Sequence, residues 1–172
     1  MKLKIYSYKS VKSTNDTAIR LIKKNIKQGI VISDVQTNGK GQRGKKWISK
    51  KGNLFISIFF PISKRLNLNK TTLINVKIIK NILTNIIPHK INLKLPNDLE
   101  IMNKKVCGIL QEIIYKDEIK FLIIGVGINI NSSPKLKEYE TTYINKYNNK
   151  INRSKIVNFI KNKFENKYSY YA

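Results

Sequence analysis

The chain has 172 residues, of which 41% are hydrophobic and 26% are charged, a composition that fits one folded domain with its own core. Its 34 basic residues outnumber the 10 acidic ones, which gives a net charge of +24 at pH 7. A single cysteine and a single histidine exclude an internal disulfide and a Cys/His zinc site. The N-terminus lacks a signal-peptide pattern and no segment has the roughly 18 unbroken apolar residues of a membrane span, so we expect a cytoplasmic protein without a membrane partner.

The excess of positive charge has two explanations. Lys-rich surfaces bind phosphate backbones, which suggests a basic nucleic-acid-binding module. However, Lys, Asn and Ile supply 81 of the 172 residues, and only four of the basic residues are Arg, the type that reads bases by paired hydrogen bonds. These three residue types share A/T-rich codons, so we attribute the charge to biased composition and expect no specific DNA binding.

The first half of the chain opens with a strand, a helix and a second strand. Alternating apolar residues predict a strand at 3–8, and a buried strand is expected at 30–36. Between them we expect a helix that Ser13 or Thr14 caps and that Gly29 ends.

The second half begins with an amphipathic helix over 70–87 that Pro88 stops. Its expected core positions are Leu73, Val76, Ile79, Leu83 and Ile86. After this helix, further strands are expected at 91–96, 99–102, 106–115 and 119–130. A turn is expected at Asn103-Lys104, a hairpin turn at 116–118, and a last helix over 154–165.

Strands outnumber helices in this pattern, and several strands are joined by hairpins. We therefore predict an α+β fold with a mixed, mostly antiparallel sheet flanked by helices. Residues 1–131 are expected to form the core domain, and residues 132–172 a polar C-terminal tail with one helix.

A polar loop over 37–52 precedes the strand expected at 53–61. The glycines at 39, 41 and 44 nearly match two nucleotide-binding patterns, but both patterns need a helix that begins at the last glycine, and here another strand follows. The glycines can still bring backbone N–H groups close to an anion, and Lys40 and Arg43 add positive charge. We interpret the loop as a phosphate-binding segment, with a lysine-rich surface loop as the alternative.

Five short motifs occur in order along the chain. They are Ser13-Thr14-Asn15, the loop from Gln36 to Trp47, Lys94-Leu95-Pro96-Asn97-Asp98, Lys105-Val106-Cys107-Gly108-Ile109-Leu110 and Gly125-Val126-Gly127-Ile128-Asn129. In this order and spacing the set resembles the biotin protein ligase family over about residues 11–131. The resemblance implies the fold of the biotin and lipoate ligases, which is related to that of class II synthetases.

The resemblance also implies a two-step reaction. Biotin and MgATP would form biotinyl-5′-AMP, and a lysine of a biotin carboxyl carrier protein would then take the biotin. The implied cofactors are ATP and Mg²⁺, the implied partner is the carrier domain of acetyl-CoA carboxylase or a similar carboxylase, and a homodimer stays open.

Site residues follow from the resemblance, motif by motif. It implies that biotin is bound by Ser13, Thr14, Asn15, Gln36, Lys40, Gly41, Gln42 and Gly108. It implies that ATP is bound by Trp47, Lys94, Asn97, Lys105 and Asn129. It implies that Asp98 holds magnesium through the phosphates and that Lys105, Lys40 and Arg43 are catalytic. Plainer roles compete with these, because Ser13 also fits a helix cap and Lys105 is one lysine among many.

Two positions depart from the family pattern. Leu95 replaces a usual Trp, and Gln42 stands where many members have an Arg that retains the adenylate, so we expect adenylate to leak. No DNA-binding winged helix precedes the motifs, so we expect no repressor role. No SH3-like domain is recognisable after them, and since that domain aids ATP and acceptor binding in the family, we expect weak activity. Cys107 is expected to pack as a small apolar residue, and His89 to be exposed.

Three alternatives remain beside biotin ligation. A lipoate or octanoate ligase or transferase has the same fold, and a nucleic-acid-binding module or an inactive homologue would carry no ligase activity.

Overall fold

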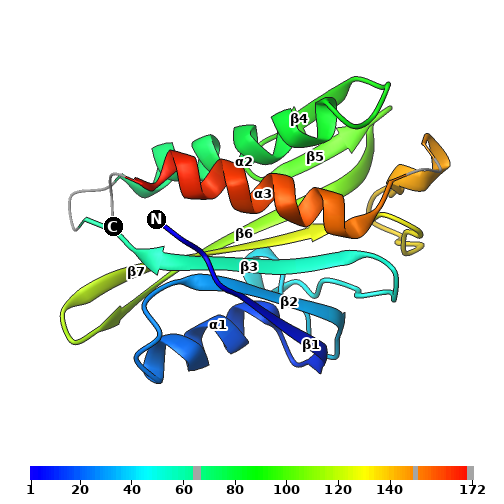
Figure 1. The fold of residues 1–172 in the computed structure, drawn as a ribbon. Coiled ribbons are helices and arrows are strands. Elements are labelled where there is room, and N and C mark those ends of the chain that lie inside the picture. The colour runs from blue at the N-terminus through cyan, green and yellow to red at the C-terminus, as the bar shows by residue number, and fades with distance from the viewer. Residues whose placement is uncertain (64–66, 149–150, 170–172) are drawn as a thin grey trace.

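A computed structural model describes residues 1–63, 67–148 and 151–169 of the chain, and in it seven strands form one sheet with helices on both faces (Figure 1). The strands are β1 (Ile5–Val11), β2 (Gly29–Gln36), β3 (Leu54–Pro61), β4 (Ile91–Lys94), β5 (Asp98–Ile101), β6 (Lys104–Lys116) and β7 (Ile119–Ile128). The helices are α1 (Thr14–Lys23), α2 (Leu68–Thr84) and α3 (Arg153–Lys167), with short 3₁₀ turns at Gln42–Gly44 and Ile144–Lys146.

The sheet order is β1-β2-β3-β7-β6-β5-β4. Among the described strands, β1 and β2 form the one parallel pair, and every other neighbouring pair is antiparallel. The prediction of an α+β fold with a mixed, mostly antiparallel sheet is therefore confirmed.

Each face of the sheet carries its own helical layer. Alternation along β3 puts Ile56 and Ile58 in the same cluster as residues of α2 and α3, whereas Phe59 packs with residues of α1. Figure 1 shows α1 on one face of the sheet and α2 and α3 on the other. Ala18 and Ile22 of α1 pack in the smaller cluster with Phe59. The larger cluster lies under α2 and α3, so most of the core is on the side of the sheet away from α1.

The end of α1 differs from the prediction. The helix ends at Lys23, and Asn25 takes a left-handed conformation with φ of 67°. Gly29 does not end the helix but begins β2, where a Cβ would lie 2.7 Å from the Tyr6 ring. The glycine is thus needed for packing against a neighbouring side chain and not for a helix cap.

The α2 helix also ends earlier than expected, at Thr84, with Asn85 as its C-cap. Of its expected core positions, Val76, Ile79 and Leu83 are buried, whereas Leu73 is exposed. The turn expected at Asn103-Lys104 lies one residue earlier, at Met102-Asn103, where both residues have positive φ. The expected hairpin between 115 and 119 is present, since β6 and β7 pair up to Lys116 and Ile119.

The last helix, α3, packs on the same core as the sheet. Ile156, Ile160 and Phe164 are fully buried in the larger cluster. The backbone N–H of Leu3 donates to Glu165 Oε1 over 2.6 Å, which joins this helix to the N-terminal segment. Within the described part of the chain, no helix is both long and apolar enough to cross a membrane. The domain boundary at residue 131 stays a prediction.

Candidate active site

A small cavity on the α1 side of the sheet brings residues of all five sequence motifs together. Its volume is about 50 Å³, and it lies between the start of α1, the loop after β2, the β4–β5 turn and the glycines of β6 and β7. The predicted site residues in its lining are Ser13, Thr14, Asn15, Gln36, Lys40, Gly41, Gln42, Trp47, Asn97, Asp98, Lys105 and Gly108. We call it the first cavity.

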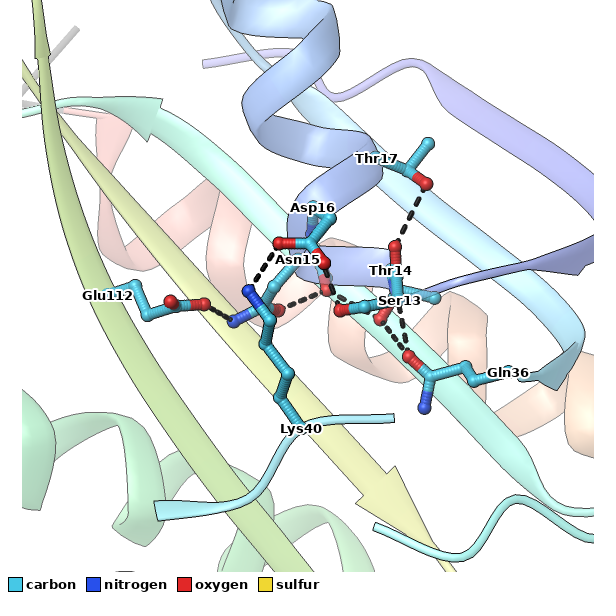
Figure 2. A network of polar contacts seen from close by, with 9 residues as sticks. Ser13, Thr14, Asn15, Asp16, Thr17, Gln36, Lys40 and Glu112 are labelled. Carbon is cyan, nitrogen blue, oxygen red and sulfur yellow. Dashed lines mark hydrogen bonds and ion pairs between the residues drawn. The ribbon is translucent and has the colours of Figure 1, made fainter. Parts of the chain in front are cut away.

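The start of α1 is tied to the end of β2. Ser13 caps the helix by accepting from the Asp16 N–H, so its expected capping role is present. The backbone N–H and the hydroxyl of Thr14 both donate to Gln36 Oε1, over 2.8 Å and 3.1 Å (Figure 2). Gln36 Nε2 in turn donates to Ser49 Oγ over 3.1 Å, which links this network to the loop.

The side chain of Asn15 is held from two sides. Asn15 Nδ2 donates to Glu112 Oε2 over 2.5 Å (Figure 2), and its Oδ1 lies 2.5 Å from Ser57 Oγ. A Cβ on Gly125 would lie 2.4 Å from Asn15 Oδ1, so only glycine leaves room for this amide. The orientation of Asn15 is therefore fixed by a carboxylate, a hydroxyl and a glycine.

Lys40 is the loop residue that contacts α1. Its ammonium group is paired with the Asp16 carboxylate (Figure 2). The hydrogen bond with Asp16 raises the pKa of Lys40 above its usual value, against the opposing effect of burial. The loop is thereby attached to the first turn of α1.

Trp47 lies flat on two glycines of the central strands. A Cβ on Gly127 would be 2.4 Å from Trp47 Cε2, and a Cβ on Gly108 would be 2.7 Å from Trp47 Cζ3. The indole Nε1 is buried and has no hydrogen-bond partner among the described residues. A buried donor without a partner is costly, so this N–H is suited to a ligand acceptor.

Lys105 is confined between a carboxylate and two aromatic rings. Its Nζ lies 2.8 Å from Asp98 Oδ2, 5.4 Å from the Trp47 ring centroid and 5.1 Å from that of Tyr139. Its side chain is only 14% exposed. This cation is thus held in one place, with part of its attraction coming from the ring faces.

A second, smaller cavity of about 20 Å³ shares Trp47 and Lys105 with the first. Asn129 lines it, and Asn129 Nδ2 donates to the Thr142 carbonyl over 3.1 Å, which leaves the buried Oδ1 without a partner in the described structure. Backbone hydrogen bonds from Lys105 to Glu140 and from Thr142 to Lys105 hold the segment with Tyr139 beside the start of β6. Lys105 therefore stands at the junction of two cavities.

Two of the predicted site residues, Arg43 and Lys94, are not among the described residues that line either cavity. Arg43 is exposed in a left-handed conformation with φ of 53°. Lys94 Nζ lies 2.9 Å from Glu100 Oε1, and this hydrogen bond raises the pKa of Lys94. Their roles in catalysis and in ATP binding stay predictions.

The described residues contain no group of three or more His, Cys, Asp or Glu side chains that could hold a metal ion alone. Among the described residues, Asp98 Oδ1 is buried without a hydrogen-bond partner, while Asp98 Oδ2 lies 2.8 Å from Lys105 Nζ. Magnesium is commonly held by one or two carboxylates together with substrate phosphates, and the single free oxygen of Asp98 fits such a site.

Sequence reasoning missed three residues of the site. Ser57 is the one polar side chain in the apolar run 54–61, a signal that marks a buried polar contact. Glu112 follows Gly108 and Leu110 at a spacing of two, which places it on the same face of β6. Tyr139 carries no signal, because it lies in a polar segment without a motif.

Two other residues were expected to be inert. Cys107 is fully buried, as expected, and burial raises the pKa of its thiol far above the usual range, so it is no nucleophile. His89 was expected to be exposed, but it is half-buried, and its ring centroid lies 4.7 Å from that of Tyr147.

Comparison with known proteins supports the same conclusion as the motifs. Residues 7–129 match the Biotin/lipoate A/B protein ligase family, and the chain belongs to this family. The chain is 33% identical over 171 residues to the bifunctional ligase/repressor BirA of Bacillus subtilis (strain 168), an alignment that covers 92% of this chain and 52% of that relative. The resemblance to biotin protein ligases is thereby confirmed.

Solved structures show the same fold. The biotin protein ligase from Aquifex aeolicus, in complex with biotin and ATP, has a TM-score of 0.82 and 29% identity, and the match covers 96% of this chain and 70% of that one. The LipL1 protein of P. falciparum, in complex with lipoate, has a TM-score of 0.68 at 14% identity, with 98% and 62% covered, and shows the fold alone. The chain spans about half the length of the BirA relative.

Proposed function

We propose that this chain is a cytoplasmic biotin protein ligase, which activates biotin with ATP and transfers it to a lysine of a biotin carboxyl carrier protein. The observation that carries the proposal is the placement of Lys105 at the junction of two cavities. One cavity is lined by amide and hydroxyl groups, and the other by a buried indole N–H and a buried amide oxygen. These sets of hydrogen-bond donors and acceptors suit biotin's ureido ring and a nucleobase, respectively.

In the first step, a carboxylate oxygen of biotin would attack the α-phosphate of ATP, the P–O bond to pyrophosphate would break, and biotinyl-5′-AMP would form. Negative charge develops on the phosphate oxygens, and a fixed cation stabilises it best when it does not have to reorganise. Lys105, held by Asp98 and the two rings, supplies such a cation between the acid and the nucleotide.

In the second step, the acceptor lysine's neutral amine would attack the acyl carbon. The new C–N bond forms, the bond from the acyl carbon to the phosphate oxygen breaks, AMP leaves, and the amine loses its proton to solvent. The loop that carries Lys40, Gly41 and Gln42 lines the cavity and would shield the adenylate from water. Magnesium would neutralise phosphate charge, with Asp98 as its protein ligand.

The loop must move when substrates bind. The first cavity has a volume of about 50 Å³, whereas sites for small organic ligands usually measure about 300–1,000 Å³. The contacts that attach the loop are few and partly exposed, such as the pair of Lys40 with Asp16. Exposed ion pairs contribute little free energy, so opening costs little.

The proposal is tested by incubating the chain with biotin and MgATP and measuring biotinyl-5′-AMP by mass spectrometry. We expect adenylate from the native chain and a loss of about 100-fold or more in Lys105→Ala, the size of effect seen when one oxyanion-stabilising group is removed. Lys104→Ala is the matched control, since this neighbouring lysine pairs with Glu140 outside both cavities. Unchanged activity in a folded Lys105→Ala would contradict the site assignment.

A lipoate or octanoate ligase or transferase is the second candidate, and the fold shared with a lipoate-bound protein favours it. It predicts transfer to a lipoyl domain instead of a biotin carrier domain.

A further inference from the structure

Four exposed side chains lie close in sequence to residues that line the first cavity. Arg43 and Lys45 follow the cavity-lining Gln42, and Lys94 and Leu95 come three and two residues before the cavity-lining Asn97, so the four are exposed neighbours of two walls of the cavity. We call these four residues the rim. All four are exposed, and Leu95 is 72% exposed.

Leu95 has no packing role within the described structure. The other apolar residues of β4 and β5 alternate into the core, as Ile91 and Leu99 do, whereas the turn after β4 points Leu95 into solvent. A single exposed leucine is ordinary on a protein surface. Here, however, it stands two residues from a cavity-lining side chain and beside basic groups.

The second step of the proposed reaction needs a macromolecule at the opening of the first cavity. The acceptor lysine has only a four-carbon stem, so the surface of the acceptor protein has to approach the cavity closely. Lys105 and Asp98 lie inside the cavity, and the rim is therefore what the acceptor meets first.

The charge of the rim selects the kind of acceptor. Three of its four residues are basic, and two of these are ion-paired, Lys45 with Glu138 over 3.8 Å and Lys94 with Glu100 over 2.9 Å, so the rim and its paired carboxylates keep an excess of one positive charge, on Arg43. A partner with acidic residues around its target lysine complements this arrangement, whereas a basic partner is repelled by a chain with a net charge of +24.

We propose that the rim is the docking surface for an acidic carrier domain, with Leu95 as its apolar anchor and the basic residues as its steering charges. This inference rests on the proposed function, since it names the surface that the acceptor of the second step occupies. An apolar contact surrounded by charges is a usual arrangement of a transient protein interface.

The test separates the two steps. Adenylate formation is measured by pyrophosphate release without acceptor, and transfer is measured by adding synthetic biotinyl-5′-AMP and increasing amounts of an acidic, isolated biotin carrier domain of an acetyl-CoA carboxylase. For Leu95→Glu we expect kcat/KM for the carrier domain to fall at least tenfold through KM, with adenylate formation within about twofold of the native chain. Lys45→Glu is expected to act in the same direction and to lose more at low salt than at high salt.

Matched controls carry the same charge changes elsewhere. Tyr115→Glu alters a residue that is 65% exposed near the far end of β6, and Lys77→Glu alters an exposed lysine of α2 on the other face of the sheet. Both are expected to leave both steps unchanged. Equal effects of Leu95→Glu and Tyr115→Glu on transfer would overturn the docking proposal, and so would a loss of adenylate formation in Leu95→Glu.

A binding readout distinguishes failure of the docking proposal from failure of the proposed function. Titration of the ¹⁵N-labelled carrier domain with the native chain is expected to shift signals around its target lysine, and Leu95→Glu is expected to abolish the shifts. If the native chain makes no adenylate but these shifts occur and depend on Leu95, the docking surface stands and the proposed reaction fails. If the native chain produces no shifts, the docking surface is contradicted whatever the activity.

Discussion

At the scale of single residues, the site depends on side chains held in fixed orientations by neighbours that no motif announces. The motifs name Asn15 and Lys105, but the groups that orient them, Glu112 and Tyr139, become visible only when distant segments come together. Asn15 and Glu112 are 97 positions apart, and Lys105 and Tyr139 are 34 apart, so both contacts depend on how distant segments are arranged around the sheet, which one sequence does not reveal. The identities of many site residues were therefore predictable, and their partners were not.

Glu112 gives the first prediction at this scale. Glu112→Gln keeps an acceptor but removes the charge from the hydrogen bond to Asn15, and Glu112→Leu removes the acceptor altogether. Hydrogen bonds to charged groups contribute about 1.5–3 kcal/mol, so we expect KM for biotin to rise about tenfold or more in Glu112→Leu, with partial rescue in Glu112→Gln and a smaller change in kcat. Glu118→Gln, at the exposed hairpin turn, is the control. Equal loss of kcat and of stability in both Glu112 variants would point to a purely structural role.

Gln42 gives the second prediction. It lines the first cavity but brings no positive charge to an anionic adenylate. We expect free biotinyl-5′-AMP in the filtrate when the native chain turns over without acceptor, and several-fold less in Gln42→Arg, because a charge-assisted hydrogen bond is about twice as strong as a neutral one. Absence of free adenylate from the native chain would contradict this expectation.

At the scale of secondary structure, hydrophobic periodicity located the helices, because each has one buried face, whereas continuous apolar runs located the central strands β2, β3 and β7, which are buried on both faces for most of their length. The errors fall where a residue type has more than one use. Gly29 was assigned to a helix end because glycine often caps helices, yet it begins β2 at a point where the Tyr6 ring leaves no room for a Cβ. Likewise, the motifs include Gly108 and Gly127, but they do not reveal that the indole ring of Trp47 lies on both glycines.

Gly127→Ala follows from this packing. A Cβ would lie 2.4 Å from Trp47 Cε2 and would displace the ring, so we expect a loss of about 1–3 kcal/mol in the free energy of unfolding. Trp47 is the only tryptophan, so a red shift of the intrinsic fluorescence reports its displacement directly. Lys51→Ala is the control, since this side chain is exposed, and its spectrum should match the native one. A native-like spectrum of Gly127→Ala would argue against the stacked position of the ring.

The contact between α3 and the N-terminal segment predicts a dependence on pH. Burial alone would raise the pKa of Glu165, but the Leu3 N–H and Lys161 outweigh it and hold the pKa below the usual 4.5. A carboxyl group with a lowered pKa in the folded state stabilises the protein above the unfolded pKa, and this contribution is lost as the pH falls through the folded value. We therefore expect Glu165→Gln to be about 1 kcal/mol less stable at pH 7 in urea unfolding. The difference should shrink as the pH falls below 4.5, and a constant difference between pH 7 and acid would contradict it.

At the scale of the whole molecule, the candidate site is assembled from six segments between residues 13 and 141. Five of these segments carry the five motifs, whereas the segment with Tyr139 carries none, which is why the sequence assigned it to a polar tail. The net charge of +24 is spread along the chain and did not point to the site. What locates the site is the meeting of buried, unpaired polar atoms with one confined lysine, and both features depend on the fold.

The most direct test of this account is a competition between two acceptors in one tube, measured by intact-protein mass spectrometry. The chain would be incubated with MgATP, biotin and lipoate, together with a biotin carrier domain and a lipoyl domain. The account predicts a mass increase of one biotinyl group on the biotin carrier domain alone. A lipoyl group on the lipoyl domain would place the chain among the lipoate ligases, and no modification of either acceptor would contradict ligase activity in this chain.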